Sequence, residues 1–390
     1  MKQTAYRFFA LCFLLFLLAV PILSFLMPLQ TSSFYENRSL AEKPVFSTQA
    51  VLSGDYFNDW ETWLTDHVAA RSYLVKAQTF LRLKVLHQSV VNDIVTDGDA
   101  LLGYHSYNSW DTSYLASDAA EMADAVSVWS DAAASYGGQF YYVGLPEQYV
   151  YFQDSYPDYL ENRSWLYGPT EEAMKTAFNA AGIPFLSLYD AYRKAGNPTD
   201  YYFLSDHHYT IRGALFACQE ILININDTQN LGLYVPAGED LTFTTLPNPF
   251  LGSRNRKLFA LEDMGDTLTV AEYKEAIPFT RTDNGSEKPA SLLTLPATGD
   301  ETITYNVFMG GDVGETVIDT GRDELPSVLL IGESYTNALE TLLYASFDEM
   351  RSIDPRHFTG SISDYIAAYQ PEVVILLRDN TAYFSGAAGD

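Results

Sequence analysis

The sequence predicts an α/β fold in which helices cover both faces of a parallel sheet. Helical patterns that end in glycine alternate with short, nearly continuous apolar runs, as in QFYYVGLP at residues 139–146 and PEVVILLRD at residues 371–379. Strands buried on both faces of a parallel sheet are expected to be apolar along their whole length. The 390 residues suffice for one large domain or two smaller ones.

Composition and charge narrow the classes of protein to which the chain can belong. Apolar residues make up 47% and aromatic residues 14% of the chain, as is typical of a folded protein. The 50 acidic and 23 basic side chains give a formal net charge of -27. This charge repels nucleic acid phosphates and anionic lipid headgroups, so neither is expected as a partner. With only Cys12 and Cys218, no disulfide framework or multi-cysteine metal site is expected.

An uncharged apolar run near the N-terminus predicts a membrane-spanning helix. Residues 8–29, FFALCFLLFLLAVPILSFLMPL, are long enough to cross roughly 30 Å of hydrocarbon at about 1.5 Å per residue. Lys2 and Arg7 precede the run, and the positive-inside tendency places this end in the cytoplasm. We therefore expect residues 1–30 to form a cytoplasmic stub and an uncleaved anchor. The protein would then be a single-pass protein of the cell membrane whose main domain is extracytoplasmic; a cleavable signal peptide is the alternative.

Two further parts are expected after the anchor. Residues 31–96 begin with an extended stalk and continue with apolar residues at helical spacing, which predicts one or two amphipathic helices. The paired Trp60 and Trp63 favour core packing over a ligand groove. Residues 97–390 are expected to form the α/β domain. Between about residues 227 and 322 alternating runs and turn clusters replace helical spacing, which predicts a β-rich insertion in that domain.

A serine follows the apolar run SVLLIG and precedes a helical pattern, so Ser334 is a candidate nucleophile. Strand ends that face helix N-termini are where open α/β sheets hold reactive groups. Upstream, the segment SDHHYT places Asp206 two residues before His208, so that an acid can orient a base that takes the serine proton. Side-chain alternation favours His208 over His207 for this role. Alternatively, Ser334 and Asp206 are helix N-caps and the histidines are ordinary loop residues.

Other kinds of chemistry have less support. Asp206, His207 and His208 offer metal ligands, but adjacent histidines meet one ion poorly and no H-E-x-x-H motif is present, so no metal is expected. The sequence has no G-x-S-x-G elbow, phosphate-binding glycine loop or dinucleotide fingerprint, and no cofactor is expected. Calcium binding by the acidic surface lacks the spacing of an EF-hand loop, and solvated acidic faces explain the charge more simply.

The order of several motifs resembles that in the DHHW protein family. The segment DHHY, residues 206–209, is similar to the D-H-H-W signature of that family. TDHVAAR and a Leu-Pro-Glu strand end precede it, and FLGSRNRKL, the GES loop and IDPRHF follow it. The family's domain is similar to the SGNH-hydrolase-like domains of AlgX- and AlgJ-type alginate O-acetyltransferases. The resemblance covers most of the chain after the anchor and implies an SGNH-like parallel sheet flanked by helices.

The resemblance also implies roles for individual residues. Asp206, His208 and Ser334 correspond to the acid, base and nucleophile of the triad in the acetyltransferase relatives. The chain departs from the family pattern in having Tyr209 in place of tryptophan and Glu333 in place of aspartate or threonine. The backbone N–H at the start of the following helix, that of Tyr335, is the first candidate to stabilise a developing oxyanion. The other candidates for oxyanion or substrate contacts are Asn337, Gly252, Ser253, His207 and Tyr209.

These observations predict a membrane-anchored, SGNH-like O-acyltransferase or esterase that acts on cell-surface or exported polysaccharide through a Ser-His-Asp triad. The acyl group, expected to be acetyl, would pass from the serine to a sugar hydroxyl or to water. The relatives imply a multispanning acyltransferase as the partner that delivers the acyl group across the membrane. The alternative is a non-catalytic protein that binds glycan or scaffolds an envelope assembly, for which 28 tyrosines and 5 tryptophans offer stacking surfaces.

Overall fold

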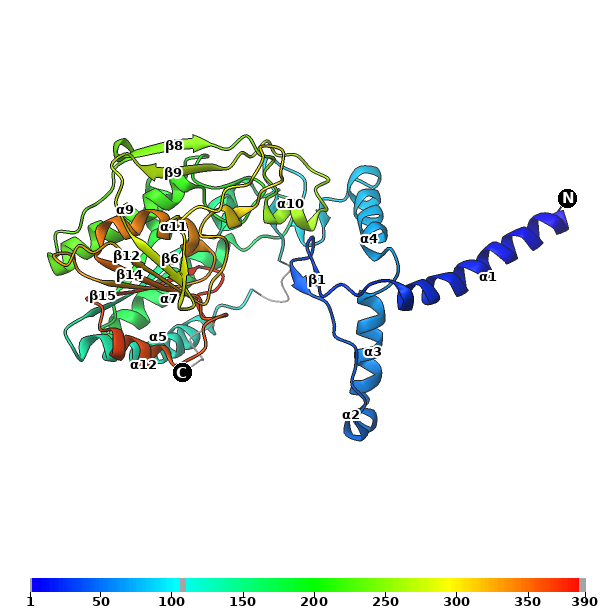
Figure 1. The fold of residues 1–390 in the computed structure, drawn as a ribbon, viewed down its shortest axis with the longest axis horizontal. Helices are drawn as coiled ribbons and strands as arrows, with labels where there is room; N and C mark the ends of the chain where they lie inside the picture. Colours follow the sequence, from blue (N-terminus) through cyan, green and yellow to red (C-terminus); the bar gives the residue numbers. More distant parts are fainter. Residues whose placement is uncertain (1, 106–109, 386–390) are drawn as a thin grey trace. The chain divides into compact units, whose positions relative to one another are not determined.

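A computed structural model describes residues 2–105 and 110–385 of the chain and divides it into two compact units (Figure 1). The first unit contains the N-terminal residues up to Asn92, together with Asn255–Glu262. The second unit contains Asp93–Arg254 and the residues from Asp263 onward. All of the candidate site residues lie in the second unit.

An eight-stranded sheet forms the centre of the second unit. Its parallel part has the order β14 (Glu349–Ile353), β13 (Val328–Ile331), β15 (Val373–Asp379), β6 (Gln139–Leu145) and β7 (Phe185–Ser187). Beyond β14 the sheet continues in antiparallel pairs with β12 (Glu315–Asp319), β10 (Thr280–Asp283) and β11 (Ser286–Lys288). Every residue of β13 is buried, as expected of a strand covered on both faces. The prediction of a mostly parallel, helix-flanked sheet is confirmed.

Helices cover both faces of this sheet (Figure 1). α5 (Leu115–Ala134), α7 (Ser164–Ala181) and α12 (Ile362–Tyr369) pack on one face, and α9 (Ile211–Gln229) and α11 (Tyr335–Leu343) pack on the other. Successive strand residues point to opposite faces, so Leu329 and Ile331 of β13 contact the α5 side and Val328 and Leu330 the α9 side. The shorter elements of this unit are β4 (Ile94–Val95), β5 (Leu102–Gly103), α6 (Gln148–Tyr151) and α8 (Leu188–Lys194).

The segment predicted as a β-rich insertion contributes to two sheets. β8 (Leu241–Thr245) and β9 (Thr269–Tyr273) form a separate antiparallel pair. β10 and β11 instead join the central sheet through β12. The segment therefore both extends the main sheet and forms a separate β pair.

The first unit begins with α1 (Lys2–Leu26), whose residues Tyr6–Leu26 have a mean hydropathy of 2.8. By length and composition this helix is able to cross a membrane. A hairpin of β1 (Ser32–Ser33) and β2 (Arg38–Ser39) follows where an extended stalk was expected. The remaining elements are α2 (Thr48–Ser53), α3 (Asp55–Asp66), α4 (Arg71–Phe80), a π-helical turn (Leu81–Val85), β3 (Val90–Val91) and part of α10 (Ser253–Lys257).

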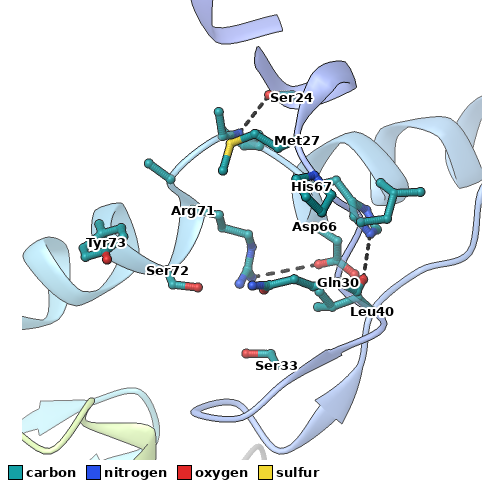
Figure 2. Close-up of a pocket in the computed structure, with 15 residues that line it drawn as sticks. Ser24, Met27, Gln30, Ser33, Leu40, Asp66, His67, Arg71, Ser72 and Tyr73 are labelled. Atoms are coloured by element: carbon teal, nitrogen blue, oxygen red, sulfur yellow. Dashed lines mark hydrogen bonds and ion pairs between the residues drawn. The ribbon is translucent and has the colours of Figure 1, made fainter. Parts of the chain in front are cut away.

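A polar cluster ties the hairpin to α3, which explains why the stalk is not extended. Asp66 accepts hydrogen bonds from Arg38 at 2.5 Å and from the backbone N–H of Ala41 at 2.9 Å. The Arg38 guanidinium lowers the pKa of Asp66 to about 2. Nearby, Ser24 of α1 accepts a hydrogen bond from the backbone N–H of Ala69 at 2.8 Å. Ser24, Asp66 and Ala69 help to line a cavity of about 140 Å³ at the end of α1 (Figure 2).

The buried Glu340 of α11 is expected to make stability depend on pH. It accepts a hydrogen bond from Ser352 of β14 at 2.7 Å, and burial raises its pKa from 4.5 to about 7. A raised folded-state pKa stabilises the fold below the unfolded-state pKa, and this stabilisation is lost as the pH rises through the folded-state pKa. The contribution that disappears between these values is up to about 3 kcal/mol. The free energy of unfolding is measured by urea unfolding of the full-length protein in detergent micelles at several pH values. As the pH rises from about 4.5 to about 7, it should fall less for Glu340→Gln than for the parent.

Glu172→Gln is the matched control, because Glu172 is an exposed glutamate on the surface of α7. This variant should follow the parent at every pH. Identical slopes for Glu340→Gln and the parent would contradict the assignment of a raised pKa to Glu340.

Candidate active site

The two sequence motifs meet at the carboxyl edge of the sheet. Ser334 lies between β13 and α11, and His208 lies in the loop that precedes α9. His208 Nε2 is 2.7 Å from Ser334 Oγ, and His208 Nδ1 is 2.6 Å from Asp206 Oδ1. The structure thus brings the three residues together in one chain of hydrogen bonds, and His208 rather than His207 faces the serine.

The carboxylate sets the direction of the proton in this chain. An ionised carboxylate only accepts hydrogen bonds, so His208 Nδ1 donates to Asp206 and Nε2 is left to accept the Ser334 hydroxyl proton. Asp206 also accepts from the backbone N–H groups of His208 at 3.0 Å and Ser253 at 2.6 Å. Burial by itself raises a carboxyl pKa, but the neighbouring imidazoles of His208 and His207 and these hydrogen bonds hold the pKa of Asp206 well below its usual range. Asp206 and His208 are buried whereas Ser334 is partly exposed, so only the serine end of the relay faces solvent.

The alternative in which Ser334 and Asp206 are helix caps does not describe this geometry. The Ser334 side chain makes no capping hydrogen bond to α11. α9 is capped by Thr210, whose hydroxyl accepts from the backbone N–H groups of Arg212 and Gly213. Ser334 and Asp206 are therefore oriented by His208 and not by the helix ends.

Gly252 and Ser253 hold the aspartate loop in place. A Cβ at Gly252 would lie 2.3 Å from the carbonyl oxygen of Ser205, so only glycine permits this approach. This close approach lets the Ser253 N–H donate a hydrogen bond to Asp206, and it brings Ser253 Oγ to 2.6 Å from His207 Nδ1. Both residues had been predicted to contact the oxyanion or the substrate. Because the Ser253 N–H is already bonded to Asp206, it is not a free oxyanion donor, and it instead stabilises the Asp206 carboxylate.

Two tyrosines join the histidine loop to α11. The Tyr209 hydroxyl donates to the carbonyl oxygen of Tyr335, and the Tyr335 hydroxyl donates to the carbonyl oxygen of His207. Tyr209 is fully buried, so its ring is not available to a substrate as the sequence had suggested. Reciprocal bonds of this kind fix the distance between the histidine loop and α11 from two sides.

A third aromatic residue supports His208 directly and was not predicted from the sequence. The rings of Tyr305 and His208 stack with centroids 3.9 Å apart and an interplanar angle of 4°. Tyr305 is buried, and burial raises its pKa well above the usual value, so the phenol stays neutral. Tyr305 lies in a region of irregular alternating sequence about a hundred residues from His208, which explains why no local pattern pointed to it.

Charged side chains surround Glu333, the residue before Ser334. Glu333 pairs with the buried Arg378 at the end of β15 and lies 3.6 Å from Arg356. Arg356 also pairs with Asp312 at 2.7 Å, and Asp312 accepts a hydrogen bond from Asn337 Nδ2 at 3.0 Å. Asn337, an oxyanion candidate, is therefore bonded to this network. The two arginines were not recognised from the sequence, because their partners are distant along the chain.

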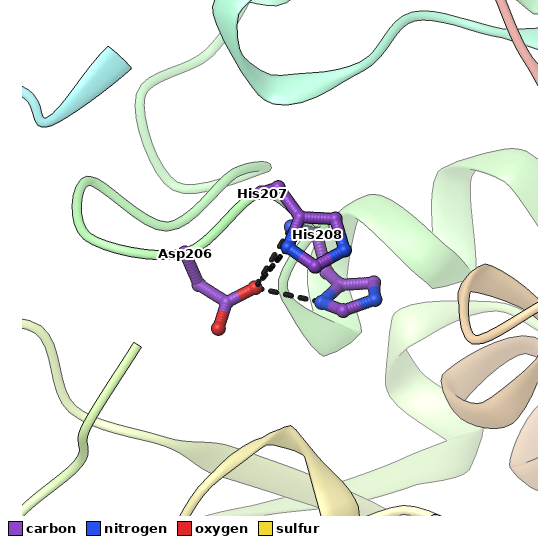
Figure 3. A group of neighbouring side chains, drawn as sticks. All are labelled: Asp206, His207 and His208. Atoms are coloured by element: carbon purple, nitrogen blue, oxygen red, sulfur yellow. Dashed lines mark hydrogen bonds and ion pairs between the residues drawn. The ribbon is translucent and has the colours of Figure 1, made fainter. Parts of the chain in front are cut away.

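Two groups of side chains have the composition of a metal site. The ligand atoms of Asp206, His207 and His208 lie within 4.8 Å of one another, and both rings face the same carboxylate (Figure 3). Since both nitrogens of His208 already serve the relay, a metal ion there would have to displace it, and the donor set fits the relay better. The second group, Asp312, Asp354 and His357, surrounds Arg356, whose guanidinium is 2.6 Å from Asp354 and supplies positive charge itself.

Known proteins share this fold, although no family model and no curated sequence matches the chain. Bacillus cereus PatB1 is similar at 20% identity and a TM-score of 0.64, over 75% of this chain and 98% of PatB1. A second PatB1 structure, with a sulfonyl adduct, matches over the same shares at 18% identity and a TM-score of 0.61. A DHHW family protein from Eubacterium siraeum matches at 18% identity and a TM-score of 0.57, over 76% of this chain and 93% of that one.

The O-acetyltransferase domain of Pseudomonas putida AlgJ also matches, over 75% of this chain and 92% of that one. Its 14% identity and TM-score of 0.47 are too low to support an argument. At these identities the likeness to PatB1 and to the DHHW family protein concerns the fold alone. It confirms the structural resemblance to a DHHW family protein that the order of the motifs predicted.

Removal of the Tyr209 hydroxyl should loosen the joint between the histidine loop and α11. Tyr209→Phe leaves the buried carbonyl oxygen of Tyr335 without this donor, which should lower the free energy of unfolding by about 1 to 2 kcal/mol. Tyr73→Phe is the control. The Tyr73 residue is 79% exposed, so loss of its hydroxyl should change the free energy of unfolding little. Urea unfolding of full-length variants in micelles measures the difference, and equal stabilities of the two variants would show that this bond does not hold the loop.

Proposed function

We propose that this protein is an SGNH-like serine O-acyltransferase or esterase, anchored in the cell membrane, that acts on cell-surface or exported polysaccharide. The observation that carries the proposal is the relay from Asp206 through His208 to Ser334, with successive distances of 2.6 and 2.7 Å. Supporting it is a fold shared with a DHHW family protein and with PatB1, one structure of which contains a sulfonyl adduct.

In the proposed first half-reaction, His208 Nε2 removes the proton of Ser334 as Oγ attacks the carbonyl carbon of an acyl ester. Asp206 keeps His208 in the required tautomer and stabilises the imidazolium without taking its proton. The leaving group departs with the proton that His208 gives back, and the acyl group remains on the serine as an ester. The low pKa of Asp206 keeps this carboxyl ionised throughout.

The negative charge on the carbonyl oxygen needs preorganised donors. Tyr335 is the first residue of α11, and first-turn N–H groups have no acceptor within their own helix. The Tyr335 N–H is therefore our choice for the first oxyanion donor, helped by the positive end of the helix dipole. The Ser253 N–H is bonded to Asp206, so a second donor must come from elsewhere in the site.

In the second half-reaction His208 deprotonates a sugar hydroxyl, which attacks the acyl-serine and releases Ser334. Water in the same position would give hydrolysis. The apolar α1 is able to hold the enzyme where polymers emerge, with residues after it outside the cytoplasm. A multispanning acyltransferase in the same membrane would supply acyl groups to the outer side.

The non-catalytic alternative gains no support from the two departures that suggested it. Tyr209 is buried and bonded to Tyr335, and Glu333 is paired with Arg378. Both residues are thus accommodated around an intact relay. Tyr209, Tyr305 and Tyr335, which lie at the site, are buried and so offer no exposed stacking surface there.

The direct test is covalent capture of the nucleophile. The full-length protein in detergent micelles is treated with phenylmethylsulfonyl fluoride and digested, and the modified peptide is identified by mass spectrometry. We expect one sulfonyl group on Ser334 and none on Ser135. Ser135 is an exposed serine that follows α5, and its hydroxyl bonds to the carbonyl oxygen of Ala132. Absence of modification at Ser334, or equal modification of both serines, would contradict an activated nucleophile.

Turnover of an activated acetyl ester should depend on the same residues. Ser334→Ala and His208→Ala are expected to lose at least about 1,000-fold in kcat/KM, because each removes a member of a relay that works as a unit. His87→Ala, an exposed histidine of the first unit, should retain parent activity. Parent-like turnover by Ser334→Ala would exclude Ser334 as the nucleophile.

Asp206→Asn separates orientation from proton removal. An amide in place of the carboxylate presents a donor or a weaker acceptor to His208 Nδ1 and so favours the wrong tautomer; kcat should fall by about 100-fold to 10,000-fold. KM should change much less, because Asp206 is buried behind His208. A large rise in KM with unchanged kcat would instead indicate a substrate-binding role.

A further inference from the structure

Large apolar side chains lie exposed along the helical part of the first unit. Eleven of them fall between residues 45 and 86: Val45, Phe46, Leu52, Phe57, Leu64, Tyr73, Leu74, Phe80, Leu81, Val85 and Leu86. The described residues of the second unit, which is several times longer, expose only Trp110, Tyr114, Val128, Tyr159, Ile223, Tyr234 and Leu295. Exposed apolar surface on this scale marks a surface that another apolar body covers.

The best-ordered part of this surface follows α3. At about 100° per residue, one side of the helix, an arc of about 120°, carries all of its aromatic and aliphatic side chains. These side chains are Tyr56, Phe57, Trp60, Trp63 and Leu64. The rest of the helix surface carries the acidic residues Asp55, Asp59, Glu61 and Asp66. α3 is therefore amphipathic, but only the Trp63 end of its apolar arc is buried within the unit.

The apolar arc is continuous with the end of the proposed membrane span. Phe25, in the last turn of α1, contacts Trp63 with ring centroids 5.5 Å apart. Trp63 contacts Trp60 at 5.4 Å, Trp60 contacts Tyr56 at 6.4 Å, and Tyr56 contacts Phe46 at 5.7 Å. Trp63 itself is buried, and we call Phe46, Tyr56, Phe57 and Trp60 the aromatic face. It begins where α1 leaves the hydrocarbon, which is the depth that tryptophan and tyrosine prefer in membranes.

The charge of this region is compatible with a lipid surface, unlike that of the rest of the chain. Residues 31–92 contain six acidic and six basic side chains and so have no net charge. Residues 93–390 contain 44 acidic and 15 basic side chains. The overall charge of -27 therefore arises beyond residue 92 and does not repel a bilayer from the aromatic face. Lys43, 6.0 Å from the Trp60 ring, adds the aromatic and basic pairing typical of interfacial segments.

We propose that the aromatic face lies in the interfacial layer of the bilayer leaflet where α1 ends, so that α3 rests on the membrane as an interfacial helix. The inference rests on the proposed anchoring by α1 and adds a second, lateral contact with lipid. A single span leaves the attached unit free to rotate about the membrane normal and to tilt. A helix held in the plane of the interface restricts the tilt, and the Ser24 to Ala69 hydrogen bond joins the end of the span to the residues that follow α3.

The test places nitroxide labels on the two sides of α3. On a Cys12→Ser background, Phe57→Cys reports on the aromatic face and Asp59→Cys on the acidic side of the same helix. Leu15→Cys, in the middle of α1, is the reference for hydrocarbon. Cys218 is buried and should not react. Each full-length variant is reconstituted at one copy per phosphatidylcholine nanodisc, which excludes a second copy as the covering body. Collision rates with oxygen, which enriches in lipid, and with a water-soluble nickel chelate are measured by electron paramagnetic resonance.

We expect the ratio of oxygen to nickel collisions at residue 57 to exceed that at residue 59 severalfold and to lie nearer the value at residue 15. A water-like ratio at residue 57 beside a lipid-like ratio at residue 15 would overturn the inference while leaving the anchor intact, and a protein partner would then be the occupant. Water-like ratios at both residue 57 and residue 15 would also overturn the proposal that α1 spans the membrane. Sulfonyl labelling of Ser334 in the same discs reports on the proposed chemistry independently of either result.

Discussion

A buried carboxylate is the constraint on which the candidate site depends. Asp206 is almost fully buried, and a charge in that position is tolerated only if donors surround it. Those donors are the ring and backbone N–H of His208 and the backbone N–H of Ser253. The hydrogen bond from the His208 ring stabilises the ionised carboxylate, and it also selects the His208 tautomer and turns Nε2 toward Ser334. The geometry of the relay thus follows from satisfying one charge.

The β-rich segment between the two motifs supplies much of this support. Ser253 bonds to Asp206, Tyr305 stacks on His208, and Asp266 accepts hydrogen bonds from the backbone N–H and the hydroxyl of Ser205 at 2.6 Å. The β-rich segment therefore extends the central sheet and also packs against the loop that carries Asp206 and His208. The histidine and serine motifs lie more than a hundred residues apart, yet His208 and Ser334 come within hydrogen-bond distance. They do so because the chain between them packs against both motifs.

Local patterns in the sequence were enough to predict β6, β7, β13 and β15 of the parallel part, but not β14, and to single out Asp206, His208 and Ser334. Continuous apolar strands and helices closed by glycine identify a parallel sheet without reference to distant contacts. The roles of Ser253, Tyr305 and Arg378 could not be found this way, because each depends on a contact made only when remote segments pack together. The same limit explains the hairpin at residues 32–39, which the distant Asp66 draws back to α3.

The two departures from the family pattern change how the site is held rather than whether the relay forms. A carboxylate beside a nucleophile opposes the negative charge that develops there, so Glu333 would be unfavourable if it were unpaired. Its longer side chain reaches Arg378, a buried cation at the end of the neighbouring strand β15, and Arg356 lies close to its other oxygen. Tyr209 replaces a larger ring but gains a hydroxyl that bonds to the backbone of Tyr335. In both cases a polar bond to a neighbouring element offsets the change and fixes α11 relative to its surroundings.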